Sequence, residues 1–392
     1  MSASPGVCCS RTPASGVTTA TSPSRVSALT GLRAVAALLV VSTHAAFATG
    51  KLSHGYIGHI YARLEIGVAI FFVLTGFLLF RPWVRAAAIG SAPPDLRRYT
   101  WHRVRRILPA YVVTVLAVFA LYTVFTPGPN PGQTWYGLLR YLTFTQIYTN
   151  DYLITLLHTG LSQTWSLAVE VSFYAALPVL AYLVLRGAFR PRRTLLGLTA
   201  LAAISPLWLV VVSTTDLLPN SAGMWLPAHI AWFAGGMALA VLEATGARCS
   251  AAIPVGIAIV LYLAVATTSG AVTKSLMYAA IATLTVAPIA LGTKGAYDRL
   301  LSSRPLIWLG EISYEIFLLH VPIMALTMGV VLRWPLFTGS LPGLIAVTLA
   351  MTIPAAWALH RRTVSRTPTL AAQAAAPTTH GPGARPSPSV RG

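Results

Sequence analysis

Long apolar stretches alternate with short polar connections along the chain and divide it into ten segments. Each is long enough, or nearly so, to cross the roughly 30 Å of hydrocarbon in a bilayer. The segments lie near residues 29–48, 66–80, 107–125, 163–185, 194–213, 224–243, 252–270, 274–292, 306–332 and 341–360. The second is the shortest of them. The pattern predicts an all-α polytopic membrane protein, a bundle of about ten transmembrane helices.

The first apolar segment contains two ionisable residues, Arg33 and His44. Eleven residues at about 100° each make three turns plus roughly 20°, so a helix places both side chains on one face, about 16 Å apart along its axis. Ionisable groups that share one stripe of a membrane helix must face something other than lipid. The pair therefore marks a candidate functional site.

Composition agrees with a membrane protein. Of the 392 residues 55% are hydrophobic and 9% are charged, whereas about a quarter of the residues in a soluble domain are charged. Residues 1–24 lack the apolar core of a secretory signal, so the first span should act as its own insertion signal. We expect one membrane domain over residues 25–362, with disordered cytoplasmic tails at 1–24 and 363–392.

The distribution of basic residues predicts the orientation in the membrane, because short cytoplasmic loops retain Lys and Arg. With both termini cytoplasmic, 22 of the 28 Lys and Arg residues lie inside, five lie outside, and Arg33 lies within the first span. The net charge of +19 thus reflects topology and attraction to anionic lipid, and nucleic acid is not an expected partner. Cys8, Cys9 and Cys249 have no metal-ligand spacing, and no metal site is expected.

Further ionisable residues fall inside other predicted spans. Glu170 lies in the fourth span, about two turns below the outer surface and level with His44, while Glu315 and His320 lie in the ninth. Arg33, Arg103 and Arg106 gather near the cytoplasmic face. The prediction is a polar path with guanidinium groups at its inner mouth and imidazole and carboxylate groups in its outer half.

Such a path suits transfer of an acyl group from a cytoplasmic, phosphate-bearing donor to a hydroxyl that approaches from the membrane or from outside. Arginine binds phosphates bidentately and stays charged, as a donor such as acyl-coenzyme A requires. Histidine can take the hydroxyl proton at neutral pH. A carboxylate such as Glu170 could orient the imidazole of His44, a hypothesis that rests on their matched depth.

Five sequence elements resemble, in order, those of the bacterial integral-membrane acyltransferase family three, whose members include O-antigen, nodulation-factor and macrolide O-acyltransferases. The elements are Leu29-Thr-Gly-Leu-Arg33, followed after ten residues by His44; Gly67-Val with Phe71-Phe-Val-Leu-Thr-Gly-Phe77; Arg103-Val-Arg-Arg-Ile-Leu-Pro-Ala-Tyr111; Trp165-Ser-Leu-Ala-Val-Glu170; and Gly310-x-x-Ser-Tyr314 with His320. Departures from the family pattern are Thr30 and Ala69 where acidic residues are common, Val171 in place of a second Glu, and His102 in place of Arg.

The resemblance implies a ten-helix enzyme that uses acyl-coenzyme A, such as acetyl-CoA, as co-substrate, with no tightly bound cofactor. It implies that His44 is catalytic, together with Arg33 and Glu170, and that Arg103 and Arg106 serve donor binding. Trp165, Tyr314, Glu315 and His320 are expected to line the pocket.

Each of these residues also has a structural interpretation. Arg33 could extend to the headgroups, and Arg103 and Arg106 could serve topology alone. Glu315 and His320 could form a structural pair, and Trp165 and Tyr314 could be interface aromatics.

Several functional hypotheses follow. The first is an O-acyltransferase of the bacterial cytoplasmic membrane, with a saccharide-bearing acceptor such as an envelope glycolipid or polysaccharide, in contact with membrane lipid. The alternatives are an O-acyltransferase of macrolides or other secondary metabolites, a transporter or flippase of a lipid-linked sugar, and a non-catalytic scaffold or sensor. Formation of a homo-oligomer is left open.

Overall fold

The computed structural model describes residues 23–149, 157–292 and 294–363, and these residues are helical with no strand among them. Most of the two predicted tails, and residues 150–156 between the third and fourth predicted spans, lie outside the described residues. The long helices are α1 (Pro23–Ala48), α3 (Ile66–Ala88), α4 (Leu96–Leu121), α6 (Trp165–Leu185), α7 (Pro191–Thr214), α8 (Leu226–Ala244), α9 (Ala252–Val265), α10 (Ala271–Ala290), α13 (Ser313–Leu326) and α14 (Leu341–Thr363). The prediction of an all-α polytopic membrane protein is confirmed.

Each predicted span corresponds to one of these helices. Nine helical segments of the described chain are long and apolar enough to cross a membrane. The tenth, α9, has only 14 residues and would cover about 21 Å. Short elements connect them: α2 (Gly55–Ala62), α5 (Trp135–Leu142), α11 (Ala296–Leu301), α12 (Arg304–Glu311), η1 (Lys51–Ser53), η2 (Arg63–Glu65), η4 (Thr159–Thr164), η5 (Asn220–Met224) and the π-helical η6 (Thr327–Leu332).

The second span is longer than the sequence suggested. The predicted span ends near residue 80, whereas helix α3 continues through Pro82 to Ala88 and so includes Arg81 and Arg85. Both guanidinium groups bind Glu243 at the end of α8, at N–O distances of 2.7 and 3.1 Å. Glu243 of α8 thus compensates the charge of both arginines, and α3 can contain them near its C-terminal end.

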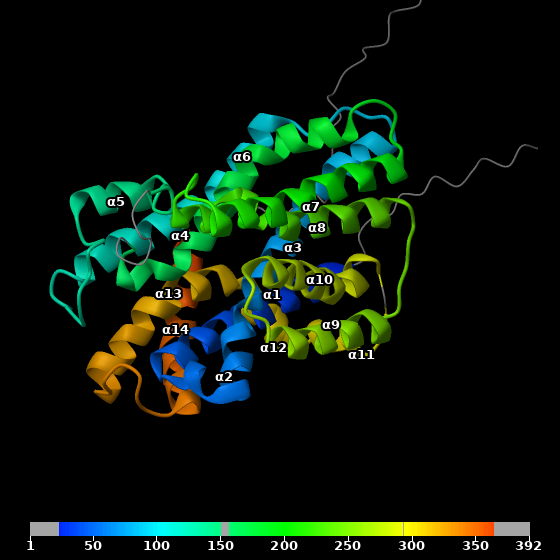
Figure 1. Cartoon of the computed structure of the whole chain (residues 1–392). Helices are drawn as coiled ribbons and strands as arrows, with labels where there is room; N and C mark the ends of the chain where they lie inside the picture. The colour runs from blue at the N-terminus through cyan, green and yellow to red at the C-terminus, as the bar shows by residue number, and fades with distance from the viewer. Residues whose placement is uncertain (1–22, 150–156, 293, 364–392) are drawn as a thin grey trace, which may run out of the picture.

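Helix α1 lies inside the bundle, between α3 on one side and α12 and α13 on the other (Figure 1). Two glycines allow its close contacts. A Cβ on Gly31 would collide with the carbonyl of Leu301, and one on Gly310 would collide with the carbonyl of Thr30. Small residues let membrane helices approach to backbone contact, and this approach brings the Arg33 end of α1 next to the helices that surround it.

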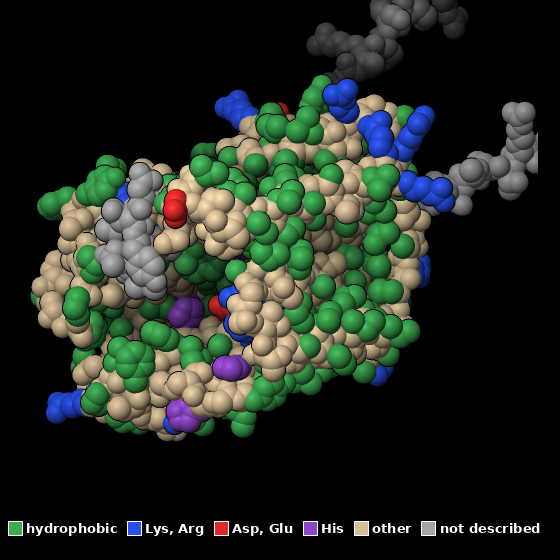
Figure 2. Space-filling view, viewed as in Figure 1, with side chains coloured by type: hydrophobic (Ala, Val, Ile, Leu, Met, Phe, Trp, Pro, Cys, Tyr) green, Lys and Arg blue, Asp and Glu red, His purple; other side chains and the backbone are tan. Residues whose placement is uncertain are grey.

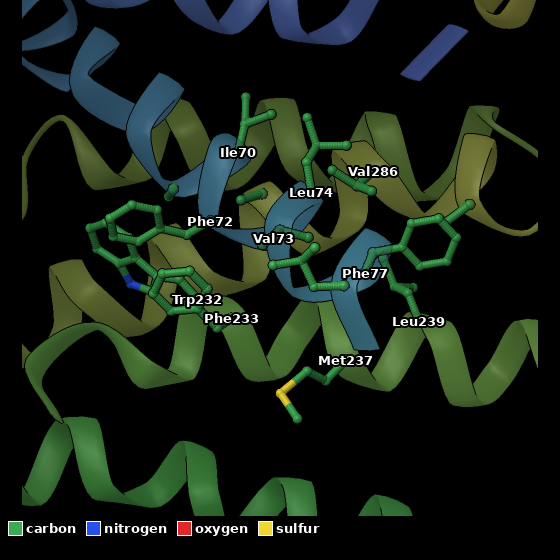
Figure 3. Close-up of a cluster of buried hydrophobic side chains, with 14 of the residues drawn as sticks. Ile70, Phe72, Val73, Leu74, Phe77, Trp232, Phe233, Met237, Leu239 and Val286 are labelled. Carbon is green, nitrogen blue, oxygen red and sulfur yellow. The ribbon is translucent and has the colours of Figure 1, made fainter. Parts of the chain in front are cut away.

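The largest apolar cluster joins α3 to α8 (Figure 3). The ring of Phe233 stacks on that of Phe72, with centroids 4.4 Å apart, and on that of Phe173, with centroids 4.0 Å apart. Gly236 lies against the carbonyl of Val73 with no room for a Cβ. This packing fixes α3, which lines the site described below.

Contacts at the two ends of α3 agree with a chain that crosses the membrane alternately in one direction and the other. Arg63, before α3, donates to the carbonyls of Val265 and Thr268 in the α9–α10 connection, at 3.1 and 2.8 Å. At the opposite end Arg81 binds Glu243. Lysine and arginine side chains gather toward the end that carries the α8–α9 connection (Figures 1 and 2). That end is the one predicted to be cytoplasmic, an orientation that stays a prediction.

The connection between α4 and α6 packs back onto α4 through a buried histidine. His158 Nε2 donates to Gln133 Oε1 at 2.6 Å, its Nδ1 accepts from Gly160 N at 3.1 Å, and its backbone N–H donates to the hydroxyl of Tyr141. Burial lowers the pKa of His158 to about 4 because desolvation disfavours the charged ring. The neutral form of His158 therefore fixes the start of η4, and with it the start of α6.

Gly236→Ala should destabilise the protein, because the added methyl group collides with the backbone of α3. Overpacking of this kind costs about 1–3 kcal/mol, and we expect a lower melting temperature in a fixed detergent. Gly256→Ala is the matched control, since nothing lies within 4 Å of the new Cβ and alanine favours a helix. Equal melting temperatures for Gly236→Ala and the wild type would show that the contact is not tight.

Acidification should destabilise the protein through His158. The pKa of His158 is depressed in the folded state relative to about 6.5 in the unfolded state, so stability is lost as the pH falls from about 6.5 toward 4, by up to about 3 kcal/mol. We expect the melting temperature of His158→Gln to fall less than that of the wild type between pH 7.5 and 4.5. His54→Gln, at an exposed position, should keep the wild-type dependence.

Candidate functional site

A cavity of about 430 Å³ lies among α1, α3, α4, α6 and α13. On α3 its lining runs from Val68 to Leu79, eleven residues and therefore about 16 Å. Its polar lining residues are Arg33, Thr75, Arg103, Arg106, Ser166, Glu170, Tyr174, Ser313 and Tyr314. The cavity thus gathers most of the intramembrane polar residues that the sequence singled out.

Three arginines give the cavity its charge. Arg33 comes from α1, and Arg103 and Arg106 come from the first half of α4. No hydrogen bond or ion pair joins any of the three to another described residue, and Arg103 Nε is buried without a partner. A buried guanidinium nitrogen without a partner, such as Nε of Arg103, is costly, whereas Arg33 is half-buried and Arg106 is exposed. The cavity is therefore suited to an anionic ligand that binds to these donors.

Glu170 is the carboxylate of the same cavity. Its Oε1 accepts hydrogen bonds from the hydroxyls of Thr75 and Tyr174, both at 2.6 Å. The oxygen is thereby fixed in orientation by α3 and by the next turn of its own helix. The negative charge of Glu170 attracts the positive charge of nearby Arg33, although no hydrogen bond or ion pair joins the two side chains.

The hypothesised contact between Glu170 and His44 is not found. The span that carries Glu170 begins with η4 rather than with an α-helix. Glu170 accepts a hydrogen bond from Thr75, which lies eight residues, about 12 Å, further along α3 than Gly67. Gly67 packs against Val40, the hydrogen-bond partner of His44, so Glu170 lies nearer the arginines than His44 does.

His44 contacts a second histidine instead. Its Nδ1 lies 2.8 Å from the carbonyl oxygen of Val40 and 3.4 Å from His320 Nε2, and the two rings are 4.9 Å apart at 69°. His320 is fully buried, with its Nδ1 2.8 Å from the carbonyl oxygen of Phe317. Since a carbonyl only accepts, both Nδ1 atoms carry hydrogen. The Nε2 of His44 keeps its lone pair and is free to accept a proton.

The histidine pair lies just beyond the end of the cavity opposite the arginines. Phe317 lines the cavity, and its ring is 6.1 Å from that of His320. Gly67, next to the lining residue Val68, packs against Val40, the hydrogen-bond partner of His44. The arginines and the histidine pair thus lie toward opposite ends of one cavity, as the spacing along α1 predicted.

The other predicted pocket residues divide into two groups. Tyr314 lines the cavity and donates to the carbonyl of Ile107 at 3.0 Å. Glu315 is buried away from the lining, with Oε1 2.9 Å from Nδ1 of His360 on α14. Trp165 packs its ring 5.2 Å from that of His229, also outside the lining. Glu315 and His320 therefore have separate partners and do not pair with each other.

Some polar partners were missed in the sequence. The bond of Tyr174 to Glu170 spans one helical turn, so the spacing of four residues could have indicated it. His360 is 45 residues from Glu315, and no local pattern connects the two. Within the part of the chain that the structure describes, no three His, Cys, Asp or Glu side chains are grouped to hold a metal ion.

Comparison with known proteins shows which protein family the chain resembles. A family described as an acyltransferase domain matches residues 26–361, a range that includes every residue of the cavity and both histidines. The chain is 28% identical over 374 residues to the acyltransferase MdmB of Streptomyces mycarofaciens, covering 86% of this chain and 90% of MdmB.

Two further relatives are longer proteins. The chain is 26% identical over 339 residues to the peptidoglycan O-acetyltransferase OatA of Listeria monocytogenes, and 25% identical over 335 residues to the O-acetyltransferase OatA of Staphylococcus aureus. These matches cover 80% and 77% of this chain but 51% of each relative. The chain therefore spans about half the length of the OatA proteins. No solved structure matches the chain significantly.

Proposed function

This chain belongs to the acyltransferase family that matches residues 26–361, and from that premise we propose that it is an integral-membrane O-acyltransferase. The proposed donor is cytoplasmic acyl-CoA, with acetyl as the acyl group. The proposed acceptor is a hydroxyl of a saccharide-bearing molecule of the cell envelope, such as a glycolipid or polysaccharide. The proposed location is the bacterial cytoplasmic membrane.

One observation carries the proposal. Within the described part of the chain, one cavity has three arginines without carboxylate partners toward one end and, just beyond its other end, a histidine whose Nε2 has no hydrogen-bond partner. Phosphate groups of a donor would complete the hydrogen bonding of Arg33, Arg103 and Arg106. A histidine about three helical turns further along α1 is placed to act on the opposite end of an extended donor.

The proposed reaction uses His44 as a general base. His44 Nε2 takes the proton of the acceptor hydroxyl while its oxygen attacks the thioester carbonyl carbon. The carbon–sulfur bond then breaks, the new ester keeps the acyl group, and the thiolate takes the proton back from His44. The products are the O-acylated acceptor and coenzyme A.

His320 has a positioning role in this scheme. Its Nε2 and the carbonyl of Val40 both face the Nδ1–H of His44, so they orient the ring and stabilise it when Nε2 is protonated. In hydrolytic triads a carboxylate does the same for its histidine. Glu170, bonded to two hydroxyls in the arginine end, would instead orient the donor-binding side of the cavity.

The name of one relative supports an acceptor class. OatA of Listeria is named for peptidoglycan, a glycan, which supports a saccharide hydroxyl. MdmB, which is named as an acyltransferase, matches over 90% of its own length, and a secondary metabolite such as a macrolide stays the second candidate acceptor.

His44→Ala should abolish acyl transfer in proteoliposomes supplied with acetyl-CoA and a panel of a muropeptide, a trehalose monoester and a macrolide glycoside. Loss of a general base typically costs 10²- to 10⁴-fold, measured as acyl-group mass on the acceptor. His320→Gln should give a smaller loss with an altered pH profile, and exposed His54→Ala is the control. Wild-type rates in His44→Ala would remove the proposed base. A changed leaflet distribution of a lipid-linked sugar without any acyl product would indicate transport.

Arg103→Gln and Arg33→Gln should each raise the KM for acetyl-CoA about tenfold or more, because each removes a charge-assisted hydrogen bond to the donor. The KM for the acceptor should stay unchanged. Arg105→Gln is the matched control, since Arg105 lies over the ring of Trp101, outside the cavity lining. An unchanged KM for acetyl-CoA in both variants would show that these arginines serve topology alone.

A further inference from the structure

A second polar cluster lies outside the cavity lining, near the His44 end of α1. Glu65 ends η2, directly before α3. Thr43, which precedes His44, donates to the carbonyl of Ala62 at 3.4 Å, so η2 runs beside the His44 end of α1. The carboxylate of Glu65 lies close enough to His44 to interact with it electrostatically.

One oxygen of Glu65 is held and the other is free. The hydroxyl of Tyr278 donates to Oε1 at 2.9 Å, and Nζ of Lys274 lies 3.7 Å from the same oxygen. No partner of Oε2 is found among the described residues. The side chain of Glu65 is 45% exposed and that of Lys274 is 35% exposed, so both can reach an additional ligand.

Glu65 and the backbone around it make more hydrogen bonds than a simple surface ion pair with Lys274 would require. An exposed Lys–Glu pair contributes at most about 1 kcal/mol, yet here a buried tyrosine donates to the carboxylate. Arg63 joins η2 to the carbonyls of the α9–α10 connection, and Tyr262 donates to the carbonyl of Ile60 at 2.8 Å. The backbone that carries Glu65 is therefore fixed from both sides, as a preorganised binding site requires.

One face of the molecule is hollowed. Figure 2 shows a hollow near the centre of one face, with histidine, acidic and basic side chains next to one another at its edge. The helix turn next to Lys274 is fixed from the core side, because the buried indole of Trp232 donates to the carbonyl of Ser275 at 2.9 Å.

We propose that Glu65 and Lys274 form the acceptor subsite and bind a sugar ring beside His44. The free Oε2 of Glu65 accepts a hydrogen bond from one ring hydroxyl, and Lys274 Nζ donates to the oxygen of a neighbouring hydroxyl. A sugar offers such adjacent hydroxyls, each of which can donate and accept. A third hydroxyl is then presented to His44 Nε2. This subsite rests on the proposed function and names the acceptor chemistry that it selects.

The test compares acceptors in the purified full-length protein. Glu65→Gln keeps the size of the side chain and its bond from Tyr278 but loses the charge. We expect the KM for the sugar acceptor with the highest turnover in the panel above to rise about tenfold. The KM for acetyl-CoA and the turnover of a simple alcohol, butanol, should stay unchanged. Lys274→Gln should act in the same direction, and Glu311→Gln, at an exposed position of α12, should behave as wild type.

Two outcomes would overturn the subsite. An unchanged KM for the sugar in both Glu65→Gln and Lys274→Gln would mean that neither side chain contacts it. An equal loss of kcat with butanol and with the sugar would mean that Glu65 acts only on the charge of His44.

A binding measurement separates this proposal from the proposed function. Trehalose is titrated into His44→Ala protein and into the double variant His44→Ala, Glu65→Gln, with tryptophan fluorescence as the readout. We expect binding by the first and at least tenfold weaker binding by the second, whether or not acyl transfer occurs. Equal affinities, or no binding by either protein, would reject the subsite. Absence of acyl transfer by the wild type to every acceptor would reject the proposed function alone.

Discussion

Positive charge without a partner inside a helix bundle is the constraint around which this protein is arranged. A membrane offers no water to solvate a guanidinium, so an intramembrane arginine needs a carboxylate, a polar cavity or a ligand. Arg81 and Arg85 obtain the carboxylate of Glu243. Arg33, Arg103 and Arg106 line a cavity instead. This difference separates arginines that stabilise helix packing from arginines that are available to a ligand.

The position of that cavity depends on close backbone contacts. Gly31 and Gly310 let α1 approach its neighbours on one side, and Gly236 lets α8 approach α3 on the other. Aromatic stacking of Phe233 between Phe72 and Phe173 fixes the second contact. Because α1 and α3 are held in this way, the arginine end and the histidine end of the site keep a separation set by helix rise. A bound donor would then meet both ends without rearrangement of the bundle.

The pairing of His44 with His320 has a chemical advantage over pairing with a carboxylate. A neutral histidine pair avoids a permanent charge at the outer end of the cavity, where desolvation would penalise it. The carboxylates of the region lie on either side of the pair: Glu170 among the arginines, and Glu65 at the surface. Charge is thus placed at the two ends where ligands are proposed to enter, and the group between them is neutral until it takes a proton.

Local information was sufficient for the helices and for the spacing of Arg33 and His44. Hydrophobic length predicts spans because lipid forbids unsatisfied backbone groups, and the rise of an α-helix sets the distance between two residues of one helix. Motif order was sufficient for the family. The partner of His44 was not predictable in this way, because matched hydropathy depth does not say which helices pack together, and Glu170 instead contacts Thr75 on α3. The contacts of His44 with His320 and of Glu315 with His360 join residues 276 and 45 positions apart. Such contacts depend on how helices pack against one another, and only the folded bundle brings these residues within reach.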